Sequence, residues 1–538
     1  MGYADRASVR PGETIRFKVS AQGIEDYQVD IVRVIAAVDA ADGPGFKERL
    51  VDTPVSGRHA GRFQPIHSGS CVVLPETDRL ARLTSFTMQA FVWPTLPGDG
   101  VQTIMGTWSP GLGAGFALVI ETDGTLALRL GSSGGSYLTV STGARLRART
   151  WSFVAASFDG ASRQAVLVQE PIDPVADPAK PLVVGARVEG ARADGGRGFL
   201  IAAWNGSQRP DQAPRGAHFN GRIEAPRLAD RALPLDAVAA LRKPIPPLGL
   251  NDALLGCWDF ARDIGSIRVI DVGPARLHGT TINLPTRAVR GHRWTGAEMN
   301  WRYAPEQYAA IHFHDDDLYD CGWADSFVLQ VPETLPSGCY AARLVAGDAV
   351  ERIPFLVRPP LGAPRARTLF VMPTATHMAY ANGAMALDSA AAEVAKGGFT
   401  VADPRTVTLA EHVELGGSLY DHHRDGSPIH HASRLRPMLD ARPRTGLWTF
   451  DADTLVLDWL DAISEPCDVV GDEDLDADGA ALLAPYAVVL TGRQPEYVST
   501  RMWDAFARYL AQGGRLMALG GNSFYWRIAF HPDLPGVI

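Results

Sequence analysis

A change in sequence pattern at a proline-rich stretch, residues 358–364 (RPPLGAP), separates two kinds of fold in this chain of 538 residues. Before it, apolar residues alternate with polar ones in short runs that end at glycine or proline. After it, short apolar runs alternate with longer amphipathic ones. Because a period of two is typical of strands and a longer period of helices, we expect an all-β part, a hinge and an α/β part.

The all-β part contains two kinds of strand pattern. PGETIRFKVSAQGIEDYQVDIVRV near the start and SFVLQVPETLPSGCYAARLVAGDAVERIPFLVRP before the hinge each predict paired strands. We expect residues 1–45 and 263–360 to form one immunoglobulin-like sandwich. Residues 46–262 carry many short runs between turns, with a hairpin signal at the Asp-Gly pair of ETDGTLAL. They resemble a laminin-G or concanavalin-like jelly roll, inserted into the sandwich or packed beside it.

Residues 361–538 alternate between strand and helix patterns. Strand-like runs lie at 368–372, 467–472, 486–492 and 515–521, and helix-like runs at 386–398, 454–463 and 498–514. This rhythm predicts a mostly parallel sheet with helices on both faces. It resembles the glutamine-amidotransferase-like version of that fold. The chain stops after HPDLPGVI with no closing strand or helix, so we expect this α/β domain to be truncated at its C-terminal end.

Composition excludes several classes of function. The net charge is -9, from 51 basic and 60 acidic residues, and no basic run suggests nucleic-acid binding. No apolar run approaches the roughly 20 residues that a bilayer requires, and the polar start lacks the apolar core of a signal peptide. Five scattered cysteines without a CxxC pair favour free thiols in a reducing cytoplasm.

Three oxygen-bearing side chains follow apolar runs in the α/β part. Tyr380 comes after 368–372, Glu496 after 486–490, and Tyr420 lies in a glycine-rich loop. Ligands of open α/β sheets bind beyond the carboxyl ends of the strands, so these side chains are candidates to converge. Two phenols and a carboxylate would make a hard, all-oxygen site that suits a high-charge metal ion, with ferric iron the natural candidate. Because a free phenol has a pKa of about 10, only a strong Lewis acid would hold it as phenolate near neutral pH. Taken singly, each residue is ordinary, since a buried tyrosine hydroxyl usually bonds the backbone and a glutamate commonly stabilises a helix start.

The segments around these residues carry a family resemblance. TATHMAYANG, GGSLYDHHRDGSPIHHASRLRPMLDARP and the last stretch from TGRQPEYVS onward resemble the large (beta) subunit of the N,N-dimethylformamidase family, and so do NLPTRAVRGHRWTG and YAAIHFHDDDLYDCGW upstream. The resemblance implies hydrolysis of the C–N bond of a formamide at a mononuclear iron, with Tyr380, Tyr420 and Glu496 as ligands. It also implies a separate small subunit and self-association of the large one.

The resemblance also implies two candidate catalytic residues, Gln494 and Asn522. Gln494 stands where the family has histidine, and an amide cannot take up a proton as an imidazole does. Asn522, in the matching GGNSFYW, is expected to contact the substrate, although turn chemistry beside two glycines would also explain it.

Other interpretations stay open. Four histidines near Tyr420 (His422, His423, His430 and His431) could build a zinc or nickel site or only a polar loop. IHFHDDDLYD, residues 311–320, could bind calcium or zinc, but a structural hydrogen-bonding role is favoured. The main alternative function is a carbohydrate-binding or adhesion protein that uses its jelly roll, and a third is a fold that has lost catalysis, with Gln494 as the trace.

Overall fold

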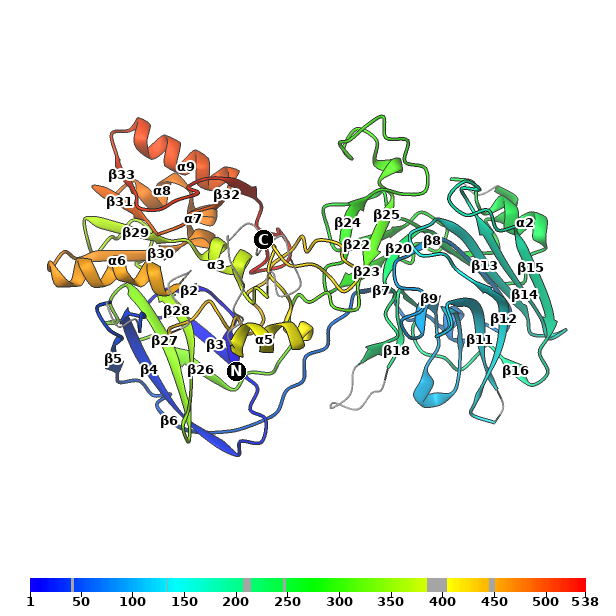
Figure 1. The fold of residues 1–538 in the computed structure, drawn as a ribbon, viewed down its shortest axis with the longest axis horizontal. Helices are drawn as coiled ribbons and strands as arrows, with labels where there is room; N and C mark the ends of the chain where they lie inside the picture. The colour runs from blue at the N-terminus through cyan, green and yellow to red at the C-terminus, as the bar shows by residue number, and fades with distance from the viewer. Residues whose placement is uncertain (40–42, 133, 207–213, 245–247, 385–403, 445–449) are drawn as a thin grey trace. The chain divides into compact units, whose positions relative to one another are not determined.

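The computed structural model describes residues 1–39, 43–132, 134–206, 214–244, 248–384, 404–444 and 450–538. They form two units (Figure 1). Unit one comprises Met1–Ile66, Tyr319–His422 and Ser427–Ile538, and unit two comprises His67–Leu318 and His423–Gly426. None of the helices within these described ranges is long and apolar enough to cross a membrane. All five cysteines are free thiols.

A β-sandwich in unit one joins strands from both ends of the all-β part. One sheet has the order β1 (Gly2–Ala4), β3 (Thr14–Val19) and β26 (Phe327–Gln330). The other has the order β2 (Ser8–Val9), β28 (Ala349–Val357), β27 (Gly338–Ala346), β4 (Asp26–Ala36) and β5 (Lys47–Val51), with β6 (Gly57–Ala60) also paired to β4. Alternate residues of both sheets face a shared core, in which Phe17 and Phe327 stack with ring centroids 4.9 Å apart. The Tyr340 hydroxyl donates to the Pro336 carbonyl at 2.8 Å and fixes the entry to β27.

The α/β part of unit one is built on four parallel strands. Their order is β30 (Cys467–Gly471), β29 (Thr368–Met372), β31 (Val488–Thr491) and β33 (Arg515–Ala518). A separate parallel pair joins β32 (Tyr497–Ser499) to β34 (Trp526–Ile528). The helices are α3 (Thr374–Tyr380), α5 (Pro404–Glu411), η4 (Val413–Leu415), α6 (Phe450–Ala462), α7 (Asp472–Asp478), α8 (Ala480–Leu483) and α9 (Thr500–Ala511). The helix expected at 386–398 lies outside the described residues.

Helices lie on both faces of this sheet, as the sequence predicts, but on one face the sandwich shares in covering the strands. Leu369 and Val371 of β29 pack against α7, α8 and α9. Phe370 and Met372, which point the other way, pack against Phe450 of α6 and against β4, β27 and β28 of the sandwich. The sandwich therefore takes the place of further helices, because any element with an apolar face can cover the strands.

Unit two is a jelly roll of two antiparallel sheets. The first has the order β12 (Tyr137–Arg145), β11 (Thr125–Ser132), β10 (Phe116–Ile120), β9 (Gln102–Gly106), β17 (Leu200–Ile201), β7 (Cys71–Val73), β23 (Gly279–Ile282) and β22 (Arg268–Asp271), with β16 (Ala191–Arg192) beside β11. The second has the order β15 (Leu182–Arg187), β14 (Gln164–Pro171), β13 (Ser152–Asp159), β8 (Phe86–Pro94), β20 (Gly221–Ala229), β25 (Ala310–Phe313) and β24 (Thr286–Val289), with β21 (Leu254–Asp259) also on β20. Pairing of β21 with β22 links the sheets into a closed barrel. Smaller elements are α1 (Asp78–Ala81), α2 (Leu235–Ala240), η1 (Pro110–Leu112), η2 (Leu248–Leu250), η3 (Pro305–Gln307), β18 (Trp204–Asn205) and β19 (Arg215–Gly216).

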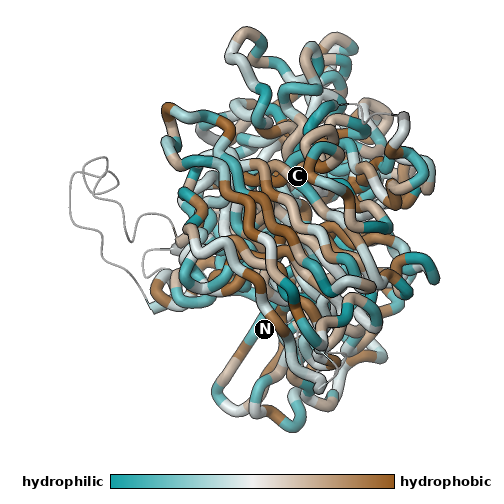
Figure 2. Tube along the Cα trace, turned by 90° about the vertical axis from the view of Figure 1, so that its right-hand side faces the viewer, coloured by the Kyte–Doolittle hydropathy of each residue, from teal (hydrophilic) through white to brown (hydrophobic). Residues whose placement is uncertain are grey.

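The jelly-roll core lies between the two sheets. Phe86 of β8 stacks on Phe116 of β10 with ring centroids 3.9 Å apart, so the sheets meet through aromatic side chains. Hydrophobic residues run in bands along neighbouring strands, and hydrophilic residues gather in the loops (Figure 2).

The structure divides the chain at other positions than the sequence suggests. Residues 268–313, expected in the sandwich, supply β22 to β25 of the jelly roll, and residues 47–60, expected in the jelly roll, supply β5 and β6 of the sandwich. Strand periodicity shows which face of a strand is buried. It does not show which sheet the strand joins.

Candidate functional site

Tyr380, Tyr420 and Glu496 meet in unit one, and we call them the oxygen cluster. The Tyr380 hydroxyl donates to Glu496 Oε2 at 2.8 Å and lies 2.9 Å from the Tyr420 hydroxyl. The Tyr420 hydroxyl donates to Glu496 Oε1 at 3.1 Å. The two phenol rings stack with centroids 4.5 Å apart. Residues that are far apart in the sequence therefore bring three side-chain oxygen donors to one point.

Tyr380 is placed by the first helix after the central strand. The sequence pattern predicts no helix here, but α3 begins at Thr374, just after β29, and Tyr380 is its last residue. The helix is tied down by its buried face: Ala375 N donates to Asp472 Oδ2 at 2.9 Å, and His377 Nε2 lies 2.7 Å from Asp453 Oδ2. These contacts fix the direction in which the Tyr380 ring points.

Glu496 lies in the segment between β31 and β32, not in the first turn of a helix, because α9 begins at Thr500. Its backbone N–H donates to Thr376 Oγ1 at 3.2 Å, which joins it to α3. Its carbonyl accepts hydrogen bonds from the backbone N–H groups of Tyr525 and Trp526, at 3.0 and 2.8 Å. Only 3% of Glu496 is exposed, so the backbone holds a buried carboxylate in one orientation.

Tyr420 lies in the loop after η4. The backbone N–H of the preceding residue, Leu419, donates to the Ala379 carbonyl at 2.8 Å, so this loop is anchored to the end of α3. Ser418 Oγ accepts from Tyr420 N at 3.1 Å and donates to Asp421 Oδ2 at 2.8 Å. Such serine and aspartate bonds to nearby backbone stabilise a compact turn.

Gln494 forms hydrogen bonds with two members of the oxygen cluster, whereas Asn522 differs in its setting. Gln494 Nε2 donates to Glu496 Oε2 at 2.7 Å and to the Tyr380 hydroxyl at 3.3 Å. Asn522 is exposed, has a φ of 50°, and occupies a turn before β34. Within the described ranges, no hydrogen bond joins its side chain to the cluster, so its geometry resembles the turn role that the sequence also allows.

Tyr497 is a member of this site that the sequence analysis missed. Its hydroxyl donates to the Tyr420 hydroxyl at 2.7 Å, and its ring meets that of Tyr380 edge to face. Its position in the sequence could have identified it, since Tyr497 directly follows the candidate ligand Glu496 in QPEY. Because β32 has only three residues and begins at Tyr497, the strand pattern was too short to detect.

Burial controls the protonation of the phenols. It raises the pKa of Tyr380 above its ordinary value, and the hydrogen bonds to Tyr420 and Glu496 add to the rise. Burial likewise raises the pKa of Tyr497, helped by its bond to Tyr420. Phenols in such a setting keep their protons unless a cation takes their place.

The donor set fits a hard metal ion of high charge. Two ligand atoms at right angles, each about 2.0 Å from one ion, lie about 2.8 Å apart, which is close to the spacing of the oxygen atoms here. Two phenolates and a carboxylate together carry three negative charges. All-oxygen ligands of this kind suit hard ions over thiophilic ones.

A second polar cluster lies in unit two. It includes His423, one of the four histidines that lie near Tyr420 in the sequence. His423 Nδ1 lies 2.7 Å from Asp316 Oδ1, whereas His422 and His430 are exposed in unit one. Burial opposes protonation of His423, but Asp316 and Asp317 outweigh it and raise its pKa. Burial lowers the pKa of His312 to about 4, although its hydrogen bond to Asp425 acts the other way.

Comparison with known proteins places these features in a family. Residues 286–537 match a sequence profile described as N,N-dimethylformamidase beta subunit-like, C-terminal, and residues 67–169 match one of laminin-G type, described as concanavalin A-like lectin/glucanases superfamily. The chain is 34% identical over 559 aligned residues to the N,N-dimethylformamidase beta subunit of Paracoccus aminophilus, and 33% identical over 561 to that of an Alcaligenes species. Each match covers 100% of this chain and 73% of the relative.

Among solved structures, the sialyllactose-bound CBM40 module of a Ruminococcus gnavus sialidase is similar, with 18% identity and a TM-score of 0.26, over 34% of this chain and 96% of that one. A similarity this low carries no inference about ligands.

Proposed function

Since this chain belongs to the N,N-dimethylformamidase beta-subunit family, we propose that it hydrolyses the C–N bond of a small formamide, N,N-dimethylformamide or a related amide. Water and the amide would give formate and the free amine. The observation that carries the proposal is the convergence of Tyr380, Tyr420 and Glu496 within hydrogen-bonding distance of one another. The names of the curated relatives support amide hydrolysis in general.

We propose that the oxygen cluster holds one iron ion, as Fe(III), through Tyr380, Tyr420 and Glu496. The three negative charges of two phenolates and a carboxylate would balance a trivalent ion, and hard oxygen donors favour it. When bound, such an ion supplies Lewis acidity toward an amide carbonyl.

The remaining residues of the site position and stabilise. Gln494 donates to both Glu496 and Tyr380, so it fixes the direction of two donor atoms. It carries no proton that it can lose near neutral pH, so it orients groups and does not transfer protons. Tyr497 donates to the Tyr420 oxygen, and a donor of this kind favours a negatively charged acceptor.

The surroundings of the cluster suit a small, weakly polar substrate. Met378, Ala379, Ala432 and Ile538 form an apolar group around the tyrosines. Apolar walls exclude water and strengthen the electrostatic interactions inside. A formamide with methyl groups on nitrogen would place those groups against such walls.

We also propose fold types for the two parts of unit one and a partner for this chain. We assign the sandwich to the immunoglobulin-like type, on its two packed sheets and the Tyr340 hydroxyl bonded back to Pro336. We assign residues 361–538 to a glutamine-amidotransferase-like catalytic domain, on its four parallel strands. Because the relatives are named beta subunits, we propose a separate partner subunit together with self-association of this chain.

The direct test is hydrolysis of N,N-dimethylformamide, followed by release of formate and dimethylamine. We expect the wild-type protein to be active and Glu496→Gln to be inactive, because Glu496 supplies the only carboxylate of the oxygen cluster. Tyr486→Phe is the matched control: this buried tyrosine bonds Asp468 at 3.0 Å in the same α/β part and should keep full activity. A wild-type protein that hydrolyses no small amide, or a Glu496→Gln variant as active as the control, would refute the proposal.

A further inference from the structure

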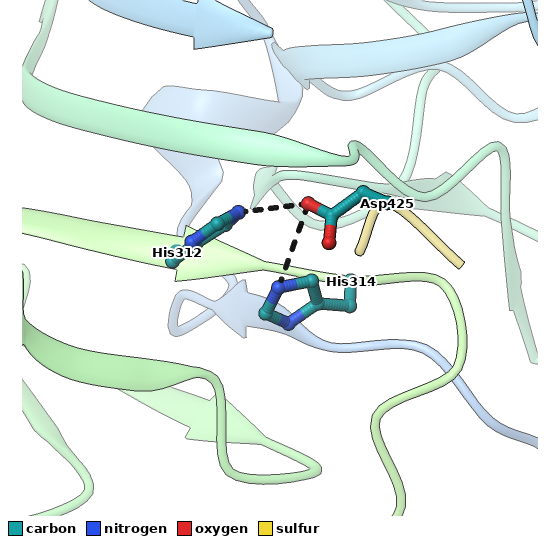
Figure 3. Close-up of side chains that lie close together, drawn as sticks. All are labelled: His312, His314 and Asp425. Atoms are coloured by element: carbon teal, nitrogen blue, oxygen red, sulfur yellow. Dashed lines mark hydrogen bonds and ion pairs between the residues drawn. The ribbon is translucent and has the colours of Figure 1, made fainter. Parts of the chain in front are cut away.

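Two histidines on one strand and an aspartate from a distant segment meet in unit two (Figure 3). His312 belongs to β25 and His314 follows that strand directly, and Asp425 belongs to the segment His423–Gly426. Residues two apart on an extended chain point to the same side, which is why both imidazoles face Asp425. We call this group the histidine cluster.

From this geometry we propose that His312, His314 and Asp425 form a second metal site, for a divalent ion of the zinc class. This site is independent of the proposed amide hydrolysis and of the oxygen cluster.

The distances between donor atoms fit such an ion. His312 Nε2 lies 3.1 Å and His314 Nε2 3.8 Å from Asp425 Oδ2. A tetrahedral zinc ion with bonds of about 2.0–2.1 Å separates its ligand atoms by about 3.3 Å. An ion can therefore be accommodated with only small movements of the side chains. Two imidazoles and a carboxylate suit zinc, cobalt or nickel, whereas calcium and magnesium prefer oxygen alone.

The partner of His314 orients its ring as metal-bound histidines are oriented. Asp317 Oδ2 lies 3.2 Å from His314 Nδ1 and also accepts hydrogen bonds from His314 N at 3.1 Å and from Ser70 Oγ at 2.6 Å. A carboxylate on one ring nitrogen makes that nitrogen the donor and directs the lone pair of the other outward. Here the other ring nitrogen, Nε2, lies 3.8 Å from Asp425 Oδ2, which is the side on which a metal ligand would be needed.

A rival arrangement of the same residues fits less well. His314, Asp317 and His423 also lie close enough to share an ion. However, the rings of His314 and His423 are stacked, with centroids 3.7 Å apart and planes 4° from parallel. Imidazole binds metals through a lone pair in the plane of the ring, and an ion between two parallel rings would lie out of both planes. His423 acts instead as an anchor, through Asp316 at 2.7 Å.

The position of Asp425 is set by its neighbours. Arg149 Nη2 donates to the Asp425 carbonyl at 2.7 Å, and Arg424 N donates to Asp316 Oδ2 at 2.9 Å. Arg222, whose guanidinium stacks on Trp93 at 4.3 Å, also acts electrostatically on Asp425.

Two measurements test the site. Protein purified without chelator is analysed for metals, and the metal-stripped Tyr380→Phe variant is titrated with Co²⁺ while its visible spectrum is recorded. The Tyr380→Phe background removes the oxygen cluster as a competitor, so this result does not depend on the proposed function. We expect one zinc-class ion per chain and, with cobalt, the absorption of a low-coordinate site containing nitrogen ligands.

Variants then locate the ion. His312→Asn and Asp425→Asn should lose it, and His292→Asn should keep it. His292 is the matched control because its Nδ1 lies 2.8 Å from the buried Glu224 carboxylate in the same unit, and because it belongs to neither of the candidate metal-binding groups found among the described residues. Folded protein that binds neither zinc nor cobalt, or binding that survives in His312→Asn and Asp425→Asn, would overturn the proposal. If those variants do not fold, the cobalt spectrum of the parent still decides whether the nitrogen-containing site exists.

Discussion

The oxygen cluster and the histidine cluster draw on one loop but offer opposite donor chemistry. Tyr420 and His423 lie close together in the sequence, yet they belong to different units. Around Tyr420 all the donors are phenol or carboxylate oxygens. Around Asp425 two imidazole nitrogens dominate. Under the two proposals, one short loop supplies ligands to two sites whose preferred metals differ, a hard trivalent ion and a borderline divalent one.

The supports of the two clusters differ as well. The oxygen cluster lies beyond the central strands of a parallel sheet and is fixed by a helix end. The histidine cluster lies at the end of an antiparallel strand and depends on side-chain carboxylates for orientation. We therefore expect metal binding at the oxygen cluster to be affected mainly by changes of its ligands. Metal binding at the histidine cluster should be affected by changes of the surrounding aspartates.

The largest expected effect is loss of one metal without the other. Tyr380→Phe removes a phenol oxygen and should abolish iron binding and lower amide hydrolysis by roughly 10³-fold, the scale of losing a preorganised electrostatic contribution. The ion of the histidine cluster should stay. Metal analysis of the folded variant, beside His312→Asn, measures both effects. Simultaneous loss of both metals in either variant would show that the clusters are not separate.

A smaller change should come from the aspartate beside His314. Asp317→Asn removes the charge that orients the ring and should weaken zinc binding by about 10- to 100-fold. Competition with a chromophoric chelator measures the affinity. Asp159→Asn is the control, because Asp159 bonds Ser162 in a turn of the same unit. Equal affinities in the two variants would count against the role of Asp317.

Gln494 bonds two members of the oxygen cluster, much as Asp317 bonds His314, so changing it tests how far the cluster depends on a neighbouring side chain. Gln494→Asn shortens the side chain, should break its bonds to Glu496 and Tyr380, and should lower activity by about 10- to 100-fold. Gln494→His introduces a group with an ordinary pKa of about 6.5, so its activity should acquire a pH dependence in that range. Rate–pH profiles of wild type and variant make the comparison. Identical profiles would mean that position 494 does not act on the reacting groups.

The two units should also differ in how stability depends on pH. Burial raises the pKa of Asp472 in unit one well above its usual range, and the charges of Asp453 and Asp474 raise it further, against the bond from Ala375 N. A raised folded-state pKa gives stability that is present below the unfolded pKa of about 3.9 and is lost as pH rises through the folded value. Asp472→Asn keeps an acceptor for Ala375 N and should stabilise unit one by about 1–3 kcal/mol at pH 8, with little effect at pH 3. Urea unfolding at both pH values measures the free energy of unfolding of the variant and of the wild type. A stabilisation that is no larger at pH 8 than at pH 3 would contradict the prediction.

The smallest effect is expected from a single hydroxyl. Tyr497→Phe removes the donor to Tyr420 and should cost about 1 kcal/mol, which is a several-fold loss of activity. It should also shift the phenolate-to-iron absorption band, because the charge on the Tyr420 oxygen changes. An unchanged band would place Tyr497 outside the electronic influence of the site.

Sequence patterns predicted the positions of strands and helices better than they predicted which sheet each strand joins. The strands of the α/β part and helices α6 and α9 lie where the periodicity predicts them. The boundaries of sandwich and jelly roll do not, because β22 to β25 carry the same alternation whichever sheet they join. Similarly, α3 is too short for a clear helical period, so no helix was predicted at Tyr380.

The positions of Tyr380, Tyr420 and Glu496 after apolar runs made them candidates to converge, but only the resemblance gave them roles as ligands. The histidine cluster was predicted only in part. Tyr380, Tyr420 and Glu496 are individually unremarkable residue types, and their meeting follows from long-range packing. IHFHDDDLYD and the four histidines near Tyr420 were each considered as possible metal-binding groups, without Asp425. Nothing in one sequence showed that they meet, since His314 and Asp425 are brought together by tertiary structure.

The most direct measurement is the metal content and visible spectrum of wild-type protein purified without chelator. The oxygen cluster predicts close to one iron per chain, with a phenolate-to-ferric charge-transfer band that disappears in Tyr380→Phe and in Tyr420→Phe and persists in Tyr486→Phe. A folded protein without iron, or with iron but no such band, would contradict the assignment of Tyr380, Tyr420 and Glu496 as the metal centre.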